Sequence, residues 1–307
     1  NEESIELLSK LNIWSDLKKS DYTHVKKIQV FGKKNATPLI WDNSNIDKNF
    51  GAIVKNKVML DSIFSKLNDI KKYENFVTNT TCDNFERTLY LNDKHYVKTN
   101  LVLCADGKNS QLRKLLLIKT ILKKTGHIAI SGFLEQSKDH EFTATQAFTE
   151  LGPIGLLPFE NKNKINFVLS VEETIYKNIS SKNDPEQYIC EKLENFFSNL
   201  NLSFKPIKKI NNLKNNLSSW PLDLNFIINP TANRAVLIGD AAHSIHPLAG
   251  QGLNLAMRDC VSVLNSIEES SKFGNDLGDI SILNSYKKDR LSKTIAMTAM
   301  TDFLFYG

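Results

Sequence analysis

Apolar residues recur along the chain with two different periods, and each period predicts its own kind of element. Spacings of three and four residues in SIELLSKLNIW and NKVMLDSIFSKLNDI predict two amphipathic helices. The apolar side of the second helix is expected to hold Val58, Leu60, Ile63, Phe64 and Leu67. VKKIQVF and TPLIW predict short strands, and RTLYLNDKHYVKTNLVLCADG predicts a hairpin turning at Asn92 and Asp93, then a buried strand ending at Asp106. This alternation of helices and buried strands indicates an α/β sheet.

The pattern changes between residues 125 and 225. GHIAISGFLEQ, EFTATQAFTEL, GPIGLLPF and KINFVLSVEE alternate apolar and polar positions, which predicts an antiparallel sheet inserted into the α/β domain. Asp184 and Pro185 mark the start of a helix, DPEQYICEKLENFFSNL, and LKNNLSSWPLDL predicts another extended segment. The α/β pattern returns with RAVLIGD. We therefore expect residues 1–124 and 226–307 to form one interrupted domain around the inserted sheet of 125–225, with 25–55 able to pack on that sheet.

Composition and charge narrow the function classes. The 307 residues carry 39 basic and 34 acidic side chains, a net charge of +5, and the lysines are scattered rather than gathered into a stripe. This pattern favours a solvated surface and no nucleic-acid partner. No apolar run reaches the roughly 18 residues of a membrane span, and the first residues do not resemble a signal peptide. We expect a cytoplasmic protein, with peripheral contact to an inner membrane left open.

The cysteines and histidines predict no metal site. Cys82, Cys104, Cys190 and Cys260 are too far apart for a metal knuckle and are expected to be buried free thiols in a reducing compartment. LRKLLLIKTILKK, residues 112–124, combines apolar and basic residues, which is compatible with contact to a membrane surface. An ordinary helix that continues into a strand is the favoured interpretation of that segment.

The most informative stretch is VLIGDAAHSIHPLAGQGLNLAMRDC, residues 236–260. A buried strand delivers Asp240 to the carboxyl edge of a sheet, where open α/β folds bind ligands. Gly250 and Gly252 allow close approach of the backbone to a flat ligand, and the helix that follows presents its first N–H groups there. The loop has no lysine, so backbone groups rather than ion pairs are expected to recognise the ligand.

A second strand-to-helix turn, ADGKNSQLR, carries Asp106, Gly107, Ser110 and Arg113. Together, D-G-x-x-S-x-x-R and G-D-A-A-H-x-x-x-P-x-x-G-Q-G-x-N resemble the class A flavoprotein monooxygenases, which share the p-hydroxybenzoate hydroxylase fold. HPLAGQGLNLAMRD is similar to the motif of the ubiquinone-biosynthesis hydroxylases within that class. LLSKLNIW, VKNKVMLDSIF, FTELGPIGLLPF and SSWPLDL also follow the family order, so the resemblance covers nearly the whole chain.

The resemblance implies an FAD-binding Rossmann-like domain interleaved with an antiparallel substrate domain. It implies that Asp240 binds the ribityl hydroxyls of FAD, with Gly239 allowing the chain to turn, and that Pro247 lies beside the isoalloxazine. The residues implied for the pyrimidine end of the flavin are Gly250, Gly252, Leu253 and Asn254. Asp106 and Gly107 correspond to the motif near the FAD pyrophosphate and the nicotinamide cofactor, with Arg113 in support.

The implied activity is hydroxylation of the aromatic ring of a polyprenylated phenol in ubiquinone biosynthesis. NAD(P)H and O2 would be co-substrates, a flavin hydroperoxide would be the oxidant, and the protein would supply orientation and a dry pocket. Candidates to line that pocket, between the inserted sheet and the flavin, are Phe148, Leu156, Leu157, Pro158 and Trp220. A ubiquinone-biosynthesis complex is an implied partner. The alternatives are another aromatic or polyprenyl substrate, and a non-catalytic flavin-binding subunit.

Several residues have a simpler interpretation. His243 and His246 are expected to order the loop rather than to transfer protons, and Ser110 to cap a helix. For Phe148 and Trp220, a place in the core is favoured over contact with the substrate. Asp259 could pair with Arg258 or support the flavin loop from behind.

The family pattern is incomplete in this sequence. G-x-G-x-x-G is absent, Ala256 replaces a usual glycine, and Lys57 stands where relatives have arginine. We therefore interpret the chain as a fragment at both ends and expect it to bind FAD poorly or not to fold alone. Stoichiometric flavin absorbance on the purified chain would contradict that expectation.

Overall fold

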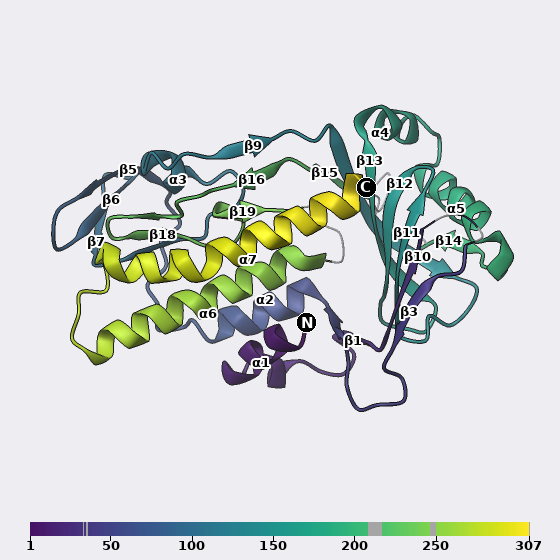
Figure 1. Ribbon diagram of the computed structural model, residues 1–307, viewed down its shortest axis with the longest axis horizontal. Helices are drawn as coiled ribbons and strands as arrows, with labels where there is room; N and C mark the ends of the chain where they lie inside the picture. Colours follow the sequence, from purple (N-terminus) through teal and green to yellow (C-terminus); the bar gives the residue numbers. More distant parts are fainter. Residues whose placement is uncertain (33, 35, 208–216, 246–249, 307) are drawn as a thin grey trace. The chain divides into compact units, whose positions relative to one another are not determined.

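The computed structural model describes residues 1–32, 34, 36–207, 217–245 and 250–306. The chain divides into two compact units (Figure 1). Unit 1 comprises Asn1–Asn68 and Thr125–Leu222, and unit 2 comprises Asp69–Lys124 and Asp223–Gly307. The chain therefore passes from one unit to the other three times. Residues 1–68 belong to unit 1, although the sequence analysis grouped residues 1–124 with the interrupted domain.

Unit 1 is built on a large sheet. Its helices are α1 Glu2–Lys10, η1 Trp14–Asp16, α2 Asn56–Ser65, α4 Glu173–Ser180, α5 Pro185–Phe196 and η2 Ser198–Leu200. Its strands are β1 Tyr22–Val25, β2 Lys27–Phe31, β3 Leu39–Asp42, β4 Gly51–Val54, β10 His127–Gln136, β11 Thr143–Thr149, β12 Gly152–Pro158, β13 Lys164–Glu172, β14 Phe204–Pro206 and β15 Ser218–Pro221. The large sheet has the order β14-β10-β13-β12-β11-β2-β3, with β15 also paired to β10, and only β11 and β2 pair in parallel. The predicted antiparallel sheet is confirmed.

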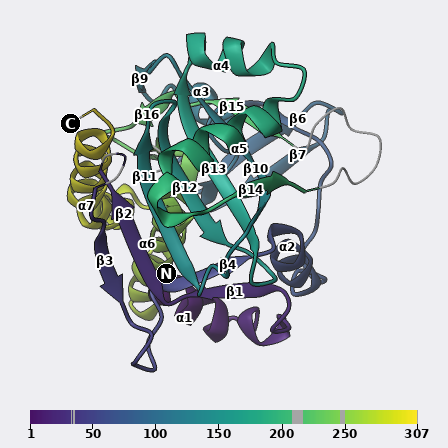
Figure 2. The same ribbon diagram turned by 90° about the vertical axis from the view of Figure 1, so that its right-hand side faces the viewer.

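One face of this sheet is covered by α4 and α5 (Figure 2). The inward residues of β13 alternate as the pattern requires: Ile165, Phe167, Leu169 and Val171 are each at most 2% exposed. Asp184 is the N-cap of helix α5, and its carboxylate accepts a hydrogen bond from the Gln187 amide at 3.0 Å. The buried side chains of the strands, which recur every second residue, thus pack against the buried side chains of α5, which recur with the helical period of about 3.6 residues.

Unit 2 contains three small sheets and two long helices. Its helices are α3 Gln111–Leu115, η3 Gly239–Ala241, α6 Gln251–Lys272 and α7 Ile280–Tyr306. Its strands are β5 Val77–Cys82, β6 Arg87–Leu91, β7 Tyr96–Thr99, β8 Val102–Cys104, β9 Ile121–Lys123, β16 Leu224–Phe226, β17 Thr231–Ala232, β18 Ala235–Leu237 and β19 His243–Ser244. The sheets have the orders β17-β18-β8, β5-β6-β7 and β19-β16-β9, and β18 pairs with β8 in parallel.

Strand β18 is buried on both faces. Val236 packs on one side with Val263 of α6 and Tyr286 of α7, and Figure 1 shows these two helices side by side. Leu237 faces the other side, among Val102 and Cys104 of β8 and their neighbours. A continuous apolar run is what a strand covered on both faces needs. RAVLIGD is such a run, so the predicted buried strand is confirmed.

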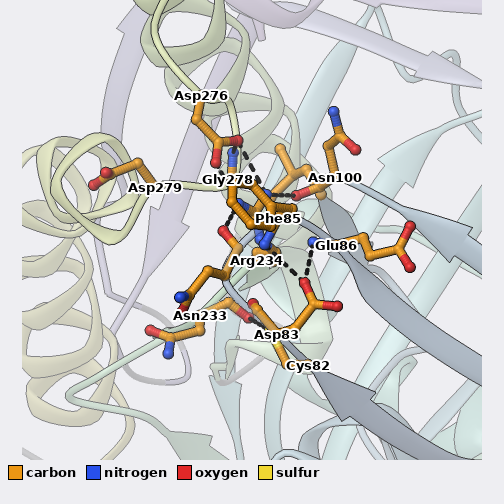
Figure 3. A network of polar contacts seen from close by, with 12 residues as sticks. Cys82, Asp83, Phe85, Glu86, Asn100, Asn233, Arg234, Asp276, Gly278 and Asp279 are labelled. Carbon is orange, nitrogen blue, oxygen red and sulfur yellow. Dashed lines mark hydrogen bonds and ion pairs between the residues drawn. The ribbon is translucent and has the colours of Figure 1, made fainter.

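A polar network fastens the amino-terminal ends of β8 and β18 (Figure 3). The buried guanidinium of Arg234 donates to the Asn100 carbonyl at 3.1 Å and pairs with Asp276, which lies in the α6–α7 loop. Its backbone amide donates to the Gly278 carbonyl at 3.2 Å. Asp83 caps the neighbouring turn by accepting from the amides of Phe85 and Glu86, both at 2.8 Å. These contacts join the amino-terminal ends of β8 and β18 to the loop that connects α6 and α7.

Asp276→Asn is expected to lower the thermal stability of the protein in a pH-dependent way. The hydrogen bond from Arg234 holds the pKa of Asp276 below its ordinary value of 3.8, with the Gly278 amide as the second cause. A lowered pKa in the folded state stabilises the protein above the ordinary value, and this stabilisation is lost as the pH falls through the lowered pKa. Thermal unfolding should therefore separate the variant from the unaltered protein at neutral pH and bring them together below pH 3.8. An equal difference at both pH values would contradict this origin.

Two predictions about burial are wrong. In α2 the buried side chain is Met59, while Leu60 is 40% and Phe64 54% exposed. Compared with the prediction, the buried side of the helix is shifted by one residue, about 100° around the helix axis. Apolar residues occur at consecutive positions in this helix, and the pattern alone does not decide which of them is buried. Among the cysteines, Cys104 and Cys190 are buried free thiols, and burial raises the pKa of each to about 12. Cys82 and Cys260 are free but exposed.

Candidate functional site

The two strand-to-helix turns of the sequence analysis meet at one edge of a sheet in unit 2. The parallel register pairs Leu237 of β18 with Cys104 of β8, so both strands end at the same level. Asp106 and Gly107 follow the first strand, and Gly239 and Asp240 follow the second. Parallel strands place their carboxyl ends together, which explains why motifs so far apart in sequence become neighbours.

A cavity of about 430 Å³ lies at this edge. It is lined by Ala105, Gly107, Ile238, Gly239, Asp240, Gly252, Leu253, Ala256 and Cys260. Five of these residues were predicted from the sequence. The lining contains one charged side chain, Asp240, among glycine, alanine and apolar residues, so the cavity suits a ligand that is recognised largely by backbone groups and shape.

The glycines of the cavity are needed for its shape. Gly107 and Gly239 have φ values of +80° and +58°, the left-handed region that other residues rarely adopt. A Cβ atom added to Gly239 would come within 3.2 Å of the Ala256 Cβ, whereas one added to Gly107 or Gly252 would meet nothing within 4 Å. Gly239 therefore permits the turn, and the other two leave open space above the backbone.

Asp240 and the start of α6 supply the polar groups of the cavity. Asp240 is exposed, and its carboxylate accepts no hydrogen bond from the part of the chain that the structure describes. Helix α6 begins after Gly250, which has φ +63° and no side-chain cap. The first N–H groups of a helix have no acceptor within it, and Gly252 and Leu253 lie in that first turn. The site thus offers a free anionic acceptor beside helix-end donors.

Arg113 connects the two turns directly. It is 6% exposed, and its guanidinium donates to the Ala241 carbonyl and to the Lys108 carbonyl, each at 2.8 Å. Ser110 caps α3 by accepting from the Arg113 amide at 2.9 Å, as predicted. The Asp106 carboxylate points into its own loop, where it accepts from Ser110 Oγ at 2.5 Å and from the Leu112 amide at 3.0 Å. Asp106 and Arg113 therefore shape the turns rather than line the cavity.

A buried carboxylate, Asp259, holds the Gly239 turn from behind. It has no exposed surface and accepts from the Gly239 amide at 2.8 Å, from His243 Nε2 at 2.6 Å and from Arg290 Nε at 2.7 Å. Tyr286 donates to the Leu237 carbonyl at 2.9 Å, and burial raises the pKa of its hydroxyl, so it stays protonated. His243 is a structural partner, as expected from the sequence, and Asp259 supports the turn.

The sequence analysis missed several of these residues. Gly252, Ala256 and Cys260 recur every four residues along α6, and this spacing could have placed Ala256 and Cys260 on the face of the cavity. No local signal identifies Arg290, because the sequence KKDR looks like an ordinary solvated charge run. Gly250 and Asn254 lie beside the cavity without lining it. Pro247 and His246 fall outside the described residues.

The five residues predicted to line a substrate pocket all lie in unit 1, on two faces of the large sheet. Leu156 and Pro158 are buried and point toward the face covered by α4 and α5. The strand registers place Phe148, Leu157 and Trp220 on the other face. A pocket on one face can therefore include only three of them. A separate cavity of about 450 Å³ on the helix-covered side is lined by Leu156, Phe31, His140 and Phe197, among others.

Comparisons with known proteins give the family. The family model described as FAD binding domain matches residues 1–301. Ubiquinone biosynthesis monooxygenase COQ6, mitochondrial, of Dictyostelium discoideum is 26% identical, covering 99% of this chain and 72% of that protein. Ubiquinone hydroxylase UbiL of Rhodospirillum rubrum is 28% identical, covering 70% of this chain and 48% of that protein.

Solved structures share the fold at low sequence identity. PqsL of Pseudomonas aeruginosa, in complex with 2-aminobenzoylacetate, matches with a TM-score of 0.77 and 16% identity, over 97% of this chain and 82% of that one. HpxO of Klebsiella pneumoniae, complexed with FAD and uric acid, matches with a TM-score of 0.71 and 15% identity, over 97% and 75%. With the family model covering nearly all of its length, the chain belongs to the FAD binding domain family.

Proposed function

We propose that this protein is an FAD-dependent monooxygenase that hydroxylates the aromatic ring of a polyprenylated phenol in ubiquinone biosynthesis, with NAD(P)H and O2 as co-substrates. The observation that carries the proposal is the cavity where β8 and β18 end, which gathers Gly107, Gly239, Asp240 and Gly252 at the start of α6. The family match and the names of the relatives, which contain ubiquinone monooxygenase and ubiquinone hydroxylase, support the reaction.

The residues present fit FAD. The open space above Gly107 and Gly252, which a Cβ atom would enter freely, suits a flat or extended ligand that lies against the backbone. Asp240 would accept hydrogen bonds from the ribityl hydroxyls, and the first N–H groups of α6 would face the electron-rich end of the flavin. FAD, once bound and reduced by NAD(P)H, would supply the O2 chemistry.

This chain's own residues bind and orient the cofactor. Arg113 and Asp259 fix the two turns, so Asp240 and the glycines are held in position before any ligand arrives. We assign FAD binding to unit 2 and substrate binding to unit 1, with Phe148, Leu157 and Trp220 as the substrate-facing candidates. The cavity has no need of a nucleophile or a proton-transfer residue from the chain, because the cofactor carries the difficult step.

The proposal can be tested by identifying the product that the protein forms from a prenylated phenol. The FAD-loaded protein, given NADPH or NADH, O2 and 2-geranylphenol, should consume the nucleotide faster than without the phenol. The product should gain one oxygen atom on its ring, detected by mass spectrometry with labelled O2. Nucleotide consumption that yields only hydrogen peroxide, for geranylated phenols with different ring substituents, would contradict the hydroxylase proposal and favour the flavin-binding alternative.

Contact with a membrane surface is part of the same proposal, as is assembly with other enzymes of ubiquinone biosynthesis. No helix in the described part of the chain is long and apolar enough to span a bilayer. However, Leu117, Ile121 and Leu122 are 87%, 56% and 54% exposed, next to the exposed lysines 119 and 123. Apolar side chains surrounded by lysines are typical of surfaces that bind anionic lipid.

Vesicle sedimentation should show this contact. The protein is expected to sediment with vesicles of phosphatidylglycerol more than with phosphatidylcholine, and Ile121→Glu should weaken binding several-fold because it adds a negative charge to the surface. Phe273→Glu is the matched control, since Phe273 is 80% exposed in the same unit but lies outside this surface. Equal binding to the two vesicle types would rule out the contact.

A further inference from the structure

The cavity on the helix-covered side of the large sheet lies within unit 1 and is separate from the cavity of unit 2. Its volume is about 450 Å³, and small-molecule sites typically measure about 300–1,000 Å³. Register partners point to the same side of a sheet, and four successive partners from β12, β11, β2 and β3 form the floor of the cavity: Leu156, Thr145, Gln29 and Ile40. The cavity therefore has the size and the formed floor of a ligand site.

Two polar side chains of this floor are available to a ligand. Neither the amide of Gln29 nor the hydroxyl of Thr145 has a hydrogen-bond partner among the described residues. Both side chains are half-buried, and their polar atoms are not enclosed by the protein. Gln136, which also lines the cavity, differs because its amide donates to the Lys138 carbonyl at 3.1 Å. The floor thus offers a donor and an acceptor from the amide beside a hydroxyl.

The rest of the interior is largely apolar. Phe31, Ile165 and Phe197 are buried side chains that line the cavity. A second cavity of about 220 Å³ shares Phe31, Phe197, Pro38 and Leu200 with it, so the apolar lining continues from one cavity into the other. A ligand with an apolar body longer than the first cavity can therefore be accommodated.

The charged side chains of the lining disfavour an anionic ligand. Among the described lining residues there are two carboxylates, Asp139 and Glu141, and one ammonium, Lys138. Asp139 pairs with Lys162 at 3.4 Å, and the Lys138 ammonium donates to the Leu200 carbonyl at 2.6 Å. The lining thus has no excess of positive charge for an anion. Because a charge that leaves water needs a counter-charge, an uncharged ligand fits this lining better.

The loop between β10 and β11 forms one wall and is held in place without a ligand. Its central residue, His140, is 6% exposed and lines the cavity. The Phe142 amide donates to His140 Nδ1 at 3.1 Å, so Nε2 carries the ring proton and donates to the Asn161 carbonyl at 3.0 Å. Burial lowers the pKa of His140, which keeps the ring neutral. Binding therefore requires little further ordering of this wall.

We propose that this cavity is a second ligand site, which binds a small uncharged molecule with an apolar body and a hydroxyl or carbonyl head that hydrogen-bonds to Gln29 and Thr145. The inference does not depend on the proposed hydroxylase activity. The site lies on the face of the sheet opposite to the substrate-facing candidates Phe148, Leu157 and Trp220. Occupancy of the two faces can therefore be measured separately.

Two probes, n-octanol and octanoate, test the class of ligand because they share the chain and differ in the charge of the head. Isothermal titration calorimetry on the purified full chain should show saturable binding of octanol and several-fold weaker binding of octanoate at neutral pH. An octanol that carries a diazirine in its chain locates the site. After irradiation, tandem mass spectrometry should find the label on residues 36–40 or 196–202, which line the two cavities.

Two variants test the polar contacts. Gln29→Leu and Thr145→Val each remove one hydrogen-bonding group at similar volume, so each should weaken octanol binding by about three- to tenfold, the contribution of one hydrogen bond. Without ligand, both variants should be as thermally stable as the unaltered protein, because the removed groups have no partner in the described part of the chain. Gln187→Leu is the matched control, since Gln187 is exposed on α5 and lines neither of these two cavities. It should bind octanol as the unaltered protein does.

Each outcome supports or overturns the inference. Saturable octanol binding that is weakened in Gln29→Leu and Thr145→Val alone supports it, as does the label on the cavity residues. Absence of saturable binding overturns it, and so does equal weakening in Gln187→Leu. A label confined to Phe148, Leu157, Trp220 or unit 2 overturns it as well. A loss of stability in the two cavity variants would also overturn it, because their polar groups would then serve the fold. All of these results leave the proposed function standing.

Discussion

Asp259→Asn is expected to destabilise unit 2 by roughly 3–5 kcal/mol, the usual cost of leaving a buried charge without its partner. Asp259 has no exposed surface and accepts three hydrogen bonds, from Gly239, His243 and Arg290. Asparagine has nearly the same shape, but its NH2 group would face a donor and the Arg290 guanidinium would lose its counter-charge. The free energy of unfolding, measured by chemical denaturation, should record this loss.

The same variant should also bind FAD more weakly, because the Gly239 turn would lose its anchor. Asp289→Asn is the matched control, since Asp289 pairs with Lys293 and Ser262 at a partly exposed position. Exposed pairs contribute about 0–1 kcal/mol, so this control should unfold nearly as the unaltered protein does. If the two variants lose similar stability, Asp259 is not the support of the turn that its contacts indicate.

Asp240→Ala is expected to raise the dissociation constant for FAD by roughly 10- to 100-fold, because hydrogen bonds to a charged acceptor contribute about 1.5–3 kcal/mol each. The ligand-free protein should be almost as stable as before, since the exposed carboxylate has no partner in the described part of the chain. Titration of FAD, followed by quenching of its fluorescence, gives the constant, and thermal unfolding without FAD gives the stability.

Glu268→Ala controls for the change in net charge, because Glu268 is exposed on α6 and does not line the cavity. It should leave the dissociation constant nearly unchanged. Equal weakening in both variants would point to a general electrostatic effect. Unchanged affinity in Asp240→Ala would mean that the ribityl chain does not contact this carboxylate, and the proposed orientation of FAD in the cavity would have to be abandoned.

Local patterns predicted most elements of the fold correctly. The alternation in β10 to β13 and the apolar run of β18 follow directly from which faces are buried, so they can be read without a structure. The cap at Asp184 and the cap at Ser110 depend on contacts within four residues. In α2 the same reasoning failed, because consecutive apolar residues allow more than one buried side.

The sequence by itself located the two turns, because Gly107 and Gly239 are needed where the backbone has a positive φ, and Asp240 and Arg113 belong to recognisable motifs. Only the tertiary structure decided that Arg113 joins the turns and that Arg290 neutralises Asp259. The reason is physical: these contacts join residues far apart along the chain, and strand register decides which side chains share a face. A sequence shows which hydrogen-bonding groups each residue carries, whereas tertiary packing decides which of these groups find a partner.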